Sequence, residues 1–232
     1  MRYHFVWLIW SSAFLLPWIV LFIVTPRLRV VMWRASLATS LFGITEPIFV
    51  PAYWLPPSLF DLAQRTRFDI ESFIFSFAIG GIGAILYNAL TRRHFAPIAA
   101  EKRREPIHRL HRAALFTPPV AFLPLALLPW NSIYAAIGAL VIGSAASVLC
   151  RPGLVTKTLI GGVLFLGLYS VFMVALAVSA PGYIAQVWNL PALSGVLVYD
   201  IPLEEFLFGA AFGLYWSGVY EHFTWSESVV GT

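Results

Sequence analysis

Long apolar segments recur along this chain, and their length constrains its fold more than any other feature. A helix that crosses the hydrocarbon core of a bilayer needs about 20 mostly apolar residues, with a range of roughly 17–25. Seven segments fall in that range: 4–24, 32–50, 70–90, 113–129, 132–149, 156–179 and 201–222. Charged residues make up only 11% of the sequence, compared with roughly 25% in a soluble domain. The sequence therefore predicts an all-α integral membrane protein with seven transmembrane helices.

The basic residues predict how these helices are oriented. Loops that face the cytoplasm carry an excess of Lys and Arg. The loops 25–34, 91–112 and 150–157 hold twelve of the 15 Lys and Arg residues, and the other three lie on the opposite side: Arg2, Arg65 and Arg67. We therefore expect a multi-pass protein of the plasma membrane, with its N-terminus outside and its C-terminus in the cytoplasm. The 91–112 loop should contact anionic headgroups, so membrane lipids are expected partners and nucleic acids are not.

Two halves of the chain share a sequence register, which indicates an internal repeat. A shift of 133 residues aligns Glu71 with Glu204, and a shift of 134 aligns Trp54 with Trp188. The alternative explanation is chance similarity between apolar segments. A repeat predicts two similar three-helix units within one membrane protein.

The predicted architecture is two parallel three-helix repeats, residues 1–90 and 132–232, joined by residues 91–131. The joining part contains the basic loop and a connecting helix, and the repeats would be related by an axis along the membrane normal. Each repeat also has an outer segment, 51–69 or 181–200, that mixes Pro, Trp and Tyr with few charges. We expect these segments to cap the bundle at the membrane interface and to exclude water.

Glutamates at membrane depth are the candidates for chemistry. Ionisable groups there are costly, and this makes them functional candidates by default. A carboxylic acid that an apolar site keeps neutral can donate a proton, and a nearby ionised carboxylate can accept one. Four glutamates in the outer halves of predicted helices are the expected catalytic residues: Glu46, Glu71, Glu204 and Glu205. They predict acid–base catalysis on an apolar substrate taken from the bilayer.

The register of the repeat suggests roles for these glutamates. Glu204 is the expected proton donor because it aligns with Glu71. Glu205 is the expected orienting or accepting partner, since adjacent helical residues point about 100° apart. Either Glu71 or Glu46 would be the opposing acid. The alternative is that these carboxylates hold outer loops or helix starts, for which Asp200 is well placed.

Aromatic side chains near the glutamates are expected to line an apolar cavity. Their faces can stabilise a cation that forms during the reaction. The expected substrate-binding residues are Tyr53, Trp54, Phe73, Trp188 and Phe206. The sequence has no Gly-rich phosphate loop, HExxH or GxSxG motif, and this sets aside the enzyme classes that these motifs mark. No metal site and no cofactor site is assigned to any residue.

Other polar residues are interpreted as structural. His108 and His111 are expected to be solvated loop residues, because neither a Cys nor a carboxylate cluster accompanies them to complete a metal site. Glu221 and His222, at the inner end of the last segment, are also expected to be solvated. Cys150 is the single cysteine, so it can form no disulfide within the chain.

The run Pro202-Leu-Glu-Glu-Phe-Leu-Phe208 resembles the Pro-x-Glu-(Glu/Asp) motif of the heterodimer-type and fused lycopene cyclases of bacteria, archaea and fungi. The predicted layout, two three-helix halves and one more helix, is similar to that family over essentially the whole chain. The resemblance implies a cofactor-free enzyme of the intramolecular lyase or isomerase type, which protonates a linear carotenoid and closes a ring. It also implies that Glu204 and Glu205 are the acidic pair of the motif. The first half departs from the pattern, because Asp69-Ile-Glu-Ser72 lacks the proline and the second acid.

The leading hypothesis is therefore an isoprenoid cyclase, and in particular one that acts on carotenoid end groups such as those of lycopene. A small membrane terpene cyclase with a shorter substrate is also similar in its buried acids. The alternative from another class is a carotenoid- or lipid-binding membrane protein, or a transporter. A transporter needs a polar path, and the inner halves of the predicted helices carry few polar groups. The sequence leaves the oligomeric state open.

Overall fold

Helices account for 76% of the computed structural model, which confirms a mostly helical membrane protein. The structure describes residues 3–230, apart from the side chains of Arg109 and Leu110; Arg2, which enters the orientation argument, lies outside this range. The helices are α1 Val6–Ala13, α2 Leu15–Val24, α3 Arg29–Ser40, α4 Glu46–Phe49, α5 Leu62–Thr66, α6 Ile70–Leu90, α7 Ala100–Arg103, α8 His111–Ala126, α9 Ser132–Cys150, α10 Val155–Ser179, α11 Tyr183–Val187 and α12 Leu203–Thr224. The strands are β1 Arg93–Pro97, β2 Leu197–Val198, β3 Ile201–Pro202 and β4 Ser226–Val230.

Among the described residues, four helical segments are long and apolar enough to cross a membrane. They are Val6–Val24, Ile70–Leu90, Ser132–Cys150 and Pro152–Ser179, close to four of the seven predicted segments. The other three predicted segments are also helical, but each is interrupted, contains prolines or carries several charged residues. The second is divided between α3, a 3-10 turn and α4, the fourth is the short helix α8 with three internal prolines, and the seventh is α12, which carries three glutamates. The seven-helix count stays a prediction.

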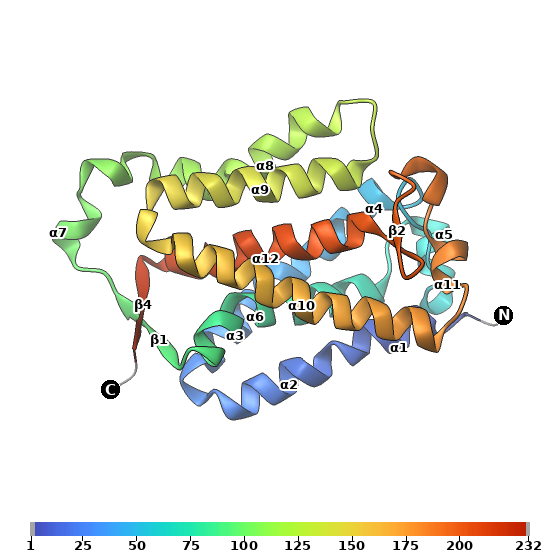
Figure 1. Ribbon diagram of the computed structural model, residues 1–232, viewed down its shortest axis with the longest axis horizontal. Helices are drawn as coiled ribbons and strands as arrows, with labels where there is room; N and C mark the ends of the chain where they lie inside the picture. Colours follow the sequence, from blue (N-terminus) through green and yellow to red (C-terminus); the bar gives the residue numbers. More distant parts are fainter. Residues whose placement is uncertain (1–2, 231–232) are drawn as a thin grey trace.

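The long helices lie side by side along the longest axis of the molecule (Figure 1). Helix α6 packs on α3, α12 packs on α10 and α9, and α8 packs on α9, while α6 and α12 contact each other in the middle. The segments with α5, α11 and β2 cover one end of the bundle, and α7, β1 and β4 lie at the other end (Figure 1). The predicted outer segments 51–69 and 181–200 are both at the α5–α11 end.

Two small antiparallel sheets were not predicted. Strand β1, which follows α6, pairs with β4, which follows α12, and the pairing runs from Arg93 opposite Val230 to Pro97 opposite Ser226. Strands β2 and β3 pair with each other within the 181–202 segment. The first pairing joins segments related by the 133-residue shift, because Arg93 aligns with Ser226 and Pro97 with Val230.

A second contact, at the opposite end of the bundle, joins segments related by the 134-residue shift. Trp54 and Trp188 form an isolated antiparallel bridge. The Leu55 N–H donates to the Val187 carbonyl oxygen at 2.9 Å, and the Asn189 N–H donates to the Tyr53 carbonyl oxygen at 2.9 Å. Each half of the chain therefore contacts its counterpart both at the capped end and at the β1–β4 end.

Glycines allow the central helices to approach closely. A Cβ atom at Gly213 in α12 would lie 2.6 Å from Phe165 Cβ and 2.8 Å from the Gly161 carbonyl oxygen, both in α10. A backbone oxygen cannot move aside without shifting the helix, so only glycine fits there. Gly167, also in α10, has nothing within 4 Å of an added Cβ.

We expect Gly213→Ala to lower the free energy of unfolding by about 1–3 kcal/mol, the usual cost of overpacking a tight contact. Gly167→Ala is the matched control and should be neutral or stabilise by about 0.5–1 kcal/mol, because alanine favours a helix over glycine. Unfolding of the two variants in detergent would show opposite signs. Equal stability of both variants would contradict the close approach of α10 and α12.

Candidate active site

Glu205 is the centre of a buried polar cluster at the start of α12. Its side chain is 4% exposed and accepts hydrogen bonds from three neutral donors. These are the Tyr169 hydroxyl at 2.5 Å, the Trp188 indole N–H at 2.7 Å and the Tyr53 hydroxyl. Tyr169 comes from α10, Trp188 follows α11, and Tyr53 belongs to the outer segment after α4. Elements from both halves of the chain therefore converge on one carboxylate.

Glu46 lies next to this cluster. It begins α4 and is 8% exposed, and its Oε1 accepts the Trp54 indole N–H at 2.7 Å. The Trp54 and Trp188 rings have centroids 5.3 Å apart, and their backbones form the bridge described above. Two adjacent tryptophans thus each donate to a buried carboxylate, and they connect Glu46 with Glu205.

Glu204 is buried beside Glu205 but has different partners. It is 1% exposed, and its Oε1 accepts the Tyr134 hydroxyl at 2.5 Å and the Ser194 backbone N–H at 2.8 Å. Its Oε2 has no hydrogen-bond partner among the described residues. Glu204 therefore has one oxygen held in place and one oxygen free.

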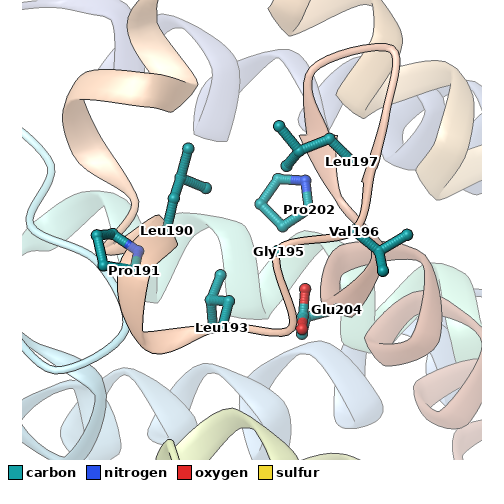
Figure 2. A pocket seen from close by; sticks show the side chains of 8 residues that line it. All are labelled: Leu190, Pro191, Leu193, Gly195, Val196, Leu197, Pro202 and Glu204. Atoms are coloured by element: carbon teal, nitrogen blue, oxygen red, sulfur yellow. The ribbon is translucent and has the colours of Figure 1, made fainter.

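A cavity of about 270 Å³ lies against Glu204. Figure 2 shows this carboxylate as the acidic group in a wall of mostly aliphatic side chains from the outer segment. The other lining residues are Leu190, Pro191, Leu193, Gly195, Val196, Leu197 and Pro202. An apolar group that entered this cavity would meet a carboxylate and little else that is polar.

In the first half of the chain, Asp69 and Glu71 lie at the start of α6. Glu71 is fully buried, its Oε1 accepts the Leu59 N–H at 2.7 Å, and its Oε2 has no partner among the described residues. Asp69 caps α6 by accepting the Ser72 N–H, and burial raises the pKa of the Asp69 carboxyl. Burial and the nearby charges of Asp69 and Glu71 raise the pKa of the Tyr183 hydroxyl, which therefore stays protonated.

The loop-holding alternative is thus observed for two of the four glutamates. Glu71 accepts from Leu59 and Glu204 accepts from Ser194, and both donors belong to the outer segment of the same half. Each of these glutamates keeps a second oxygen without a partner among the described residues. One side chain can therefore hold a loop through one oxygen while its other oxygen has no partner among the described residues.

The aromatic residues expected at the site are only partly brought together. Tyr53, Trp54 and Trp188 contact the carboxylates. Phe73 instead packs over Gly43, and Phe206 lies at the edge of the core.

Sequence reasoning missed two tyrosines of the site, Tyr134 and Tyr169. Each stands in a long apolar helix, and the signal that could have found them is a lone hydroxyl group at membrane depth, where it needs a partner.

The interpretation of Glu221 and His222 as solvated is wrong. They are 1% and 0% exposed, because strand β4 and the 91–112 loop cover the inner end of α12. Glu221 forms a salt bridge with Lys157 Nζ at 2.8 Å and accepts the Ser228 hydroxyl at 2.6 Å. This buried ion pair is part of the inner end of the fold.

The interpretation of His111 as a solvated loop residue is also wrong. His111 is 4% exposed, and its ring stacks on those of His222 and Trp225. His108 is half-buried, and both histidines lie beside Cys150, which is distant in sequence. The covering of the inner end by β4 explains this burial as well.

The fold and the site define a helical membrane protein with a cluster of buried carboxylates held by aromatic donors. Residues 131–223 match the family model described as Lycopene cyclase, and this region contains Tyr134, Tyr169, Trp188, Glu204 and Glu205. This match confirms, over residues 131–223, the resemblance seen in the motif. No curated protein and no solved structure matches the chain.

We expect Tyr169→Phe to lower the free energy of unfolding by about 1–3 kcal/mol, because it takes a donor from a buried carboxylate. In a Glu205→Leu background the same change removes a hydroxyl that has lost its acceptor, so the cost should vanish. A double-mutant cycle would then give a coupling of about 0.5–3 kcal/mol. Tyr215→Phe is the control, since its hydroxyl donates to the Leu115 carbonyl oxygen and should not couple to Glu205. A Tyr169–Glu205 coupling no larger than the control's would contradict the cluster.

Proposed function

We propose that the protein is a membrane-embedded carotenoid cyclase that protonates the end of a linear polyene, such as lycopene, and closes a ring without a cofactor. The observation that supports this most is the pair Glu204 and Glu205, which lies in the segment that matches the lycopene cyclase family model, with Glu204 in the wall of an apolar cavity. The net reaction is an isomerisation. A proton adds to the terminal double bond, a neighbouring double bond attacks the resulting cation, and loss of a proton restores neutrality.

Glu204 is the proposed proton donor. Its Oε1 is held by Tyr134 and Ser194, while its Oε2 is free and the residue lines the cavity. A group that is fixed through one oxygen and has no partner among the described residues at the other is suited to general acid catalysis. Most small-molecule pockets measure about 300–1,000 Å³, so a cavity of about 270 Å³ suits the end of a polyene rather than its whole length.

Glu205 is the proposed partner that accepts charge or a proton, with Glu46 or Glu71 as the opposing acid. Three hydrogen-bond donors converge on Glu205 and fix the position of its carboxylate. The faces of Trp54 and Trp188 would stabilise the intermediate cation. Different surroundings for two neighbouring carboxylates are what a donor and an acceptor need.

In the proposed arrangement the chain crosses the plasma membrane seven times, and its two halves are parallel repeats. The pairing of β1 with β4 and of Trp54 with Trp188 supports the repeat, because both join segments related by the internal shift. The end with α7 and the basic 91–112 loop would face the cytoplasm, and the capped end with the glutamates would face outward.

Cysteine labelling in intact cells tests this orientation. Arg65→Cys, at an exposed position of the capped end, should react with a membrane-impermeant reagent added outside, and Arg103→Cys in α7 should not. The native Cys150 is buried, so the unsubstituted protein gives the background level of labelling. Labelling of Arg103→Cys from outside would overturn the topology.

The activity is tested by expression in cells that accumulate lycopene, followed by pigment analysis. Glu204→Gln keeps the size of the side chain but removes the transferable proton, so cyclisation should fall by about 10²–10⁴-fold while the protein still inserts. Glu101→Gln, an exposed glutamate in α7, is the matched control and should leave activity unchanged. Glu221→Gln is unsuitable as a control, because it disturbs the buried pair with Lys157.

Normal turnover by Glu204→Gln would show that Glu204 is not the acid. Product from a shorter prenyl chain, and none from carotenoids, would support the terpene cyclase alternative. If the wild-type protein forms no cyclic product from several linear carotenoids and shorter prenyl substrates, the binding-protein alternative replaces the cyclase.

A further inference from the structure

Three side chains of types that commonly bind metals meet at the inner end of the bundle. The start of α12, which carries Glu204 and Glu205, lies at the opposite end (Figure 1). Cys150 is the last residue of α9, His111 is the first residue of α8, and His108 lies in the 3-10 turn Pro106–Leu110 before it. Their three candidate ligand atoms all lie within 4.8 Å of one another. The chain thus brings together residues that are 39 and 42 positions apart.

The distances around the sulfur fit a bound ion. Cys150 Sγ lies 3.6 Å from His108 Nδ1 and 3.6 Å from His111 Nδ1. In a tetrahedral zinc site the Zn–S distance is about 2.3 Å and the Zn–N distance about 2.0–2.1 Å, which places sulfur about 3.5–3.6 Å from each nitrogen. Both measured separations agree with that value.

The orientation of His111 supports the same interpretation independently. Its Nε2 lies 2.8 Å from the His222 carbonyl oxygen, and a carbonyl only accepts, so Nε2 carries the proton. In the neutral ring Nδ1 then has a free lone pair, and it faces Cys150. A second-shell carbonyl that holds the outer nitrogen is the usual partner of a metal-ligating histidine. The His111 ring stacks on the rings of both Trp225 and His222, and this fixes its plane.

We propose that Cys150, His108 and His111 bind a zinc-like divalent cation, with water or another small ligand in the fourth position. Binding replaces the thiol proton, so the cation enters as Cys150 becomes a thiolate and one proton leaves to solvent. The ion joins the basic 91–112 loop to the end of α9 and, through the His222 carbonyl, to α12. It acts as a clamp on this loop and takes no part in the chemistry proposed for the glutamates.

The competing explanation is a set of hydrogen bonds without a metal. The thiol would donate to one imidazole and accept an N–H from the other, and the sulfur would remain protonated. The two explanations differ in one measurable property, since only the metal site contains a thiolate bonded to a cation.

Cobalt(II) is the probe that separates these explanations. The full-length chain, without a polyhistidine tag, is purified in detergent, stripped with a chelator and titrated with Co²⁺. We expect about one cobalt per chain, visible d–d bands of a tetrahedral ion and a near-ultraviolet thiolate-to-cobalt charge-transfer band. Zinc should displace the cobalt and abolish both signals.

Matched variants assign the ligands. Cys150→Ser should lose the charge-transfer band and bind cobalt at least tenfold more weakly, and His108→Gln should weaken binding by a similar factor. His4→Gln, which changes a histidine near the N-terminal end of the first helix, should leave the titration unchanged. His108 is only half-buried, so His108→Gln tests the site even where Cys150→Ser fails to fold.

Wild-type protein that binds no cobalt would overturn the proposal, and so would cobalt binding without a charge-transfer band. A band that persists in Cys150→Ser would also overturn it, because the thiolate would then come from no residue of the chain. All of these readouts are independent of pigment formation, so the metal site can fail while the cyclase stands.

Discussion

Buried carboxylates in an apolar bundle are the constraint on which the capped end of this molecule depends. Each of Glu46, Glu71, Glu204 and Glu205 is at most 8% exposed, and each receives its hydrogen bonds from neutral donors. None of the salt bridges among the described residues involves them. At the inner end Glu221 is instead paired with a cationic side chain, that of Lys157. Neutral donors leave a carboxylate free to change its protonation state, and the two ends therefore suit different tasks.

The same hydrogen bonds position the outer segments. Glu71 and Glu204 accept the backbone N–H groups of Leu59 and Ser194 and so tie each outer segment to the start of a long helix. The structure of the cap and the reactivity of the site thus share side chains. A substitution such as Glu71→Gln keeps the acceptor for Leu59 and changes only the proton, which makes glutamine more informative than alanine at these positions.

Much of the fold could be predicted from apolar length, and the exceptions have local causes. Helices α6, α9 and α10 begin and end within a few residues of the predicted segments, because each is one uninterrupted apolar segment bounded by polar or charged residues. The second segment is interrupted by the 3-10 turn Leu41–Thr45, which precedes Glu46 and has no signature in hydropathy. Strands β1 and β4 are short and follow helices directly, so a sequence scan for apolar segments passes over them.

The candidate site was predictable in its acids but not in its donors. Charged residues in apolar segments stand out, whereas a single Tyr169 among apolar neighbours looks like an ordinary core residue. Similarly, His108 and His111 lack a metal-binding spacing with Cys150, because about forty residues separate them. Only the antiparallel packing of α8 on α9 brings the loop and the helix end together.

The internal shift aligns the two tryptophan donors at the site but not the two carboxylates to which they donate. Trp54 and Trp188 align, and each donates to a carboxylate, but Glu46 precedes its tryptophan on α4 whereas Glu205 follows its tryptophan on α12. A shift of 133 places Ser72 opposite Glu205, whereas the shift of 134 that aligns the tryptophans places Glu71 there. The site is therefore not symmetric, and the two carboxylates next to the tryptophan pair have different neighbours. A symmetric site would give both acids the same proton affinity, whereas a reaction that adds a proton at one carbon and removes one at another needs them to differ.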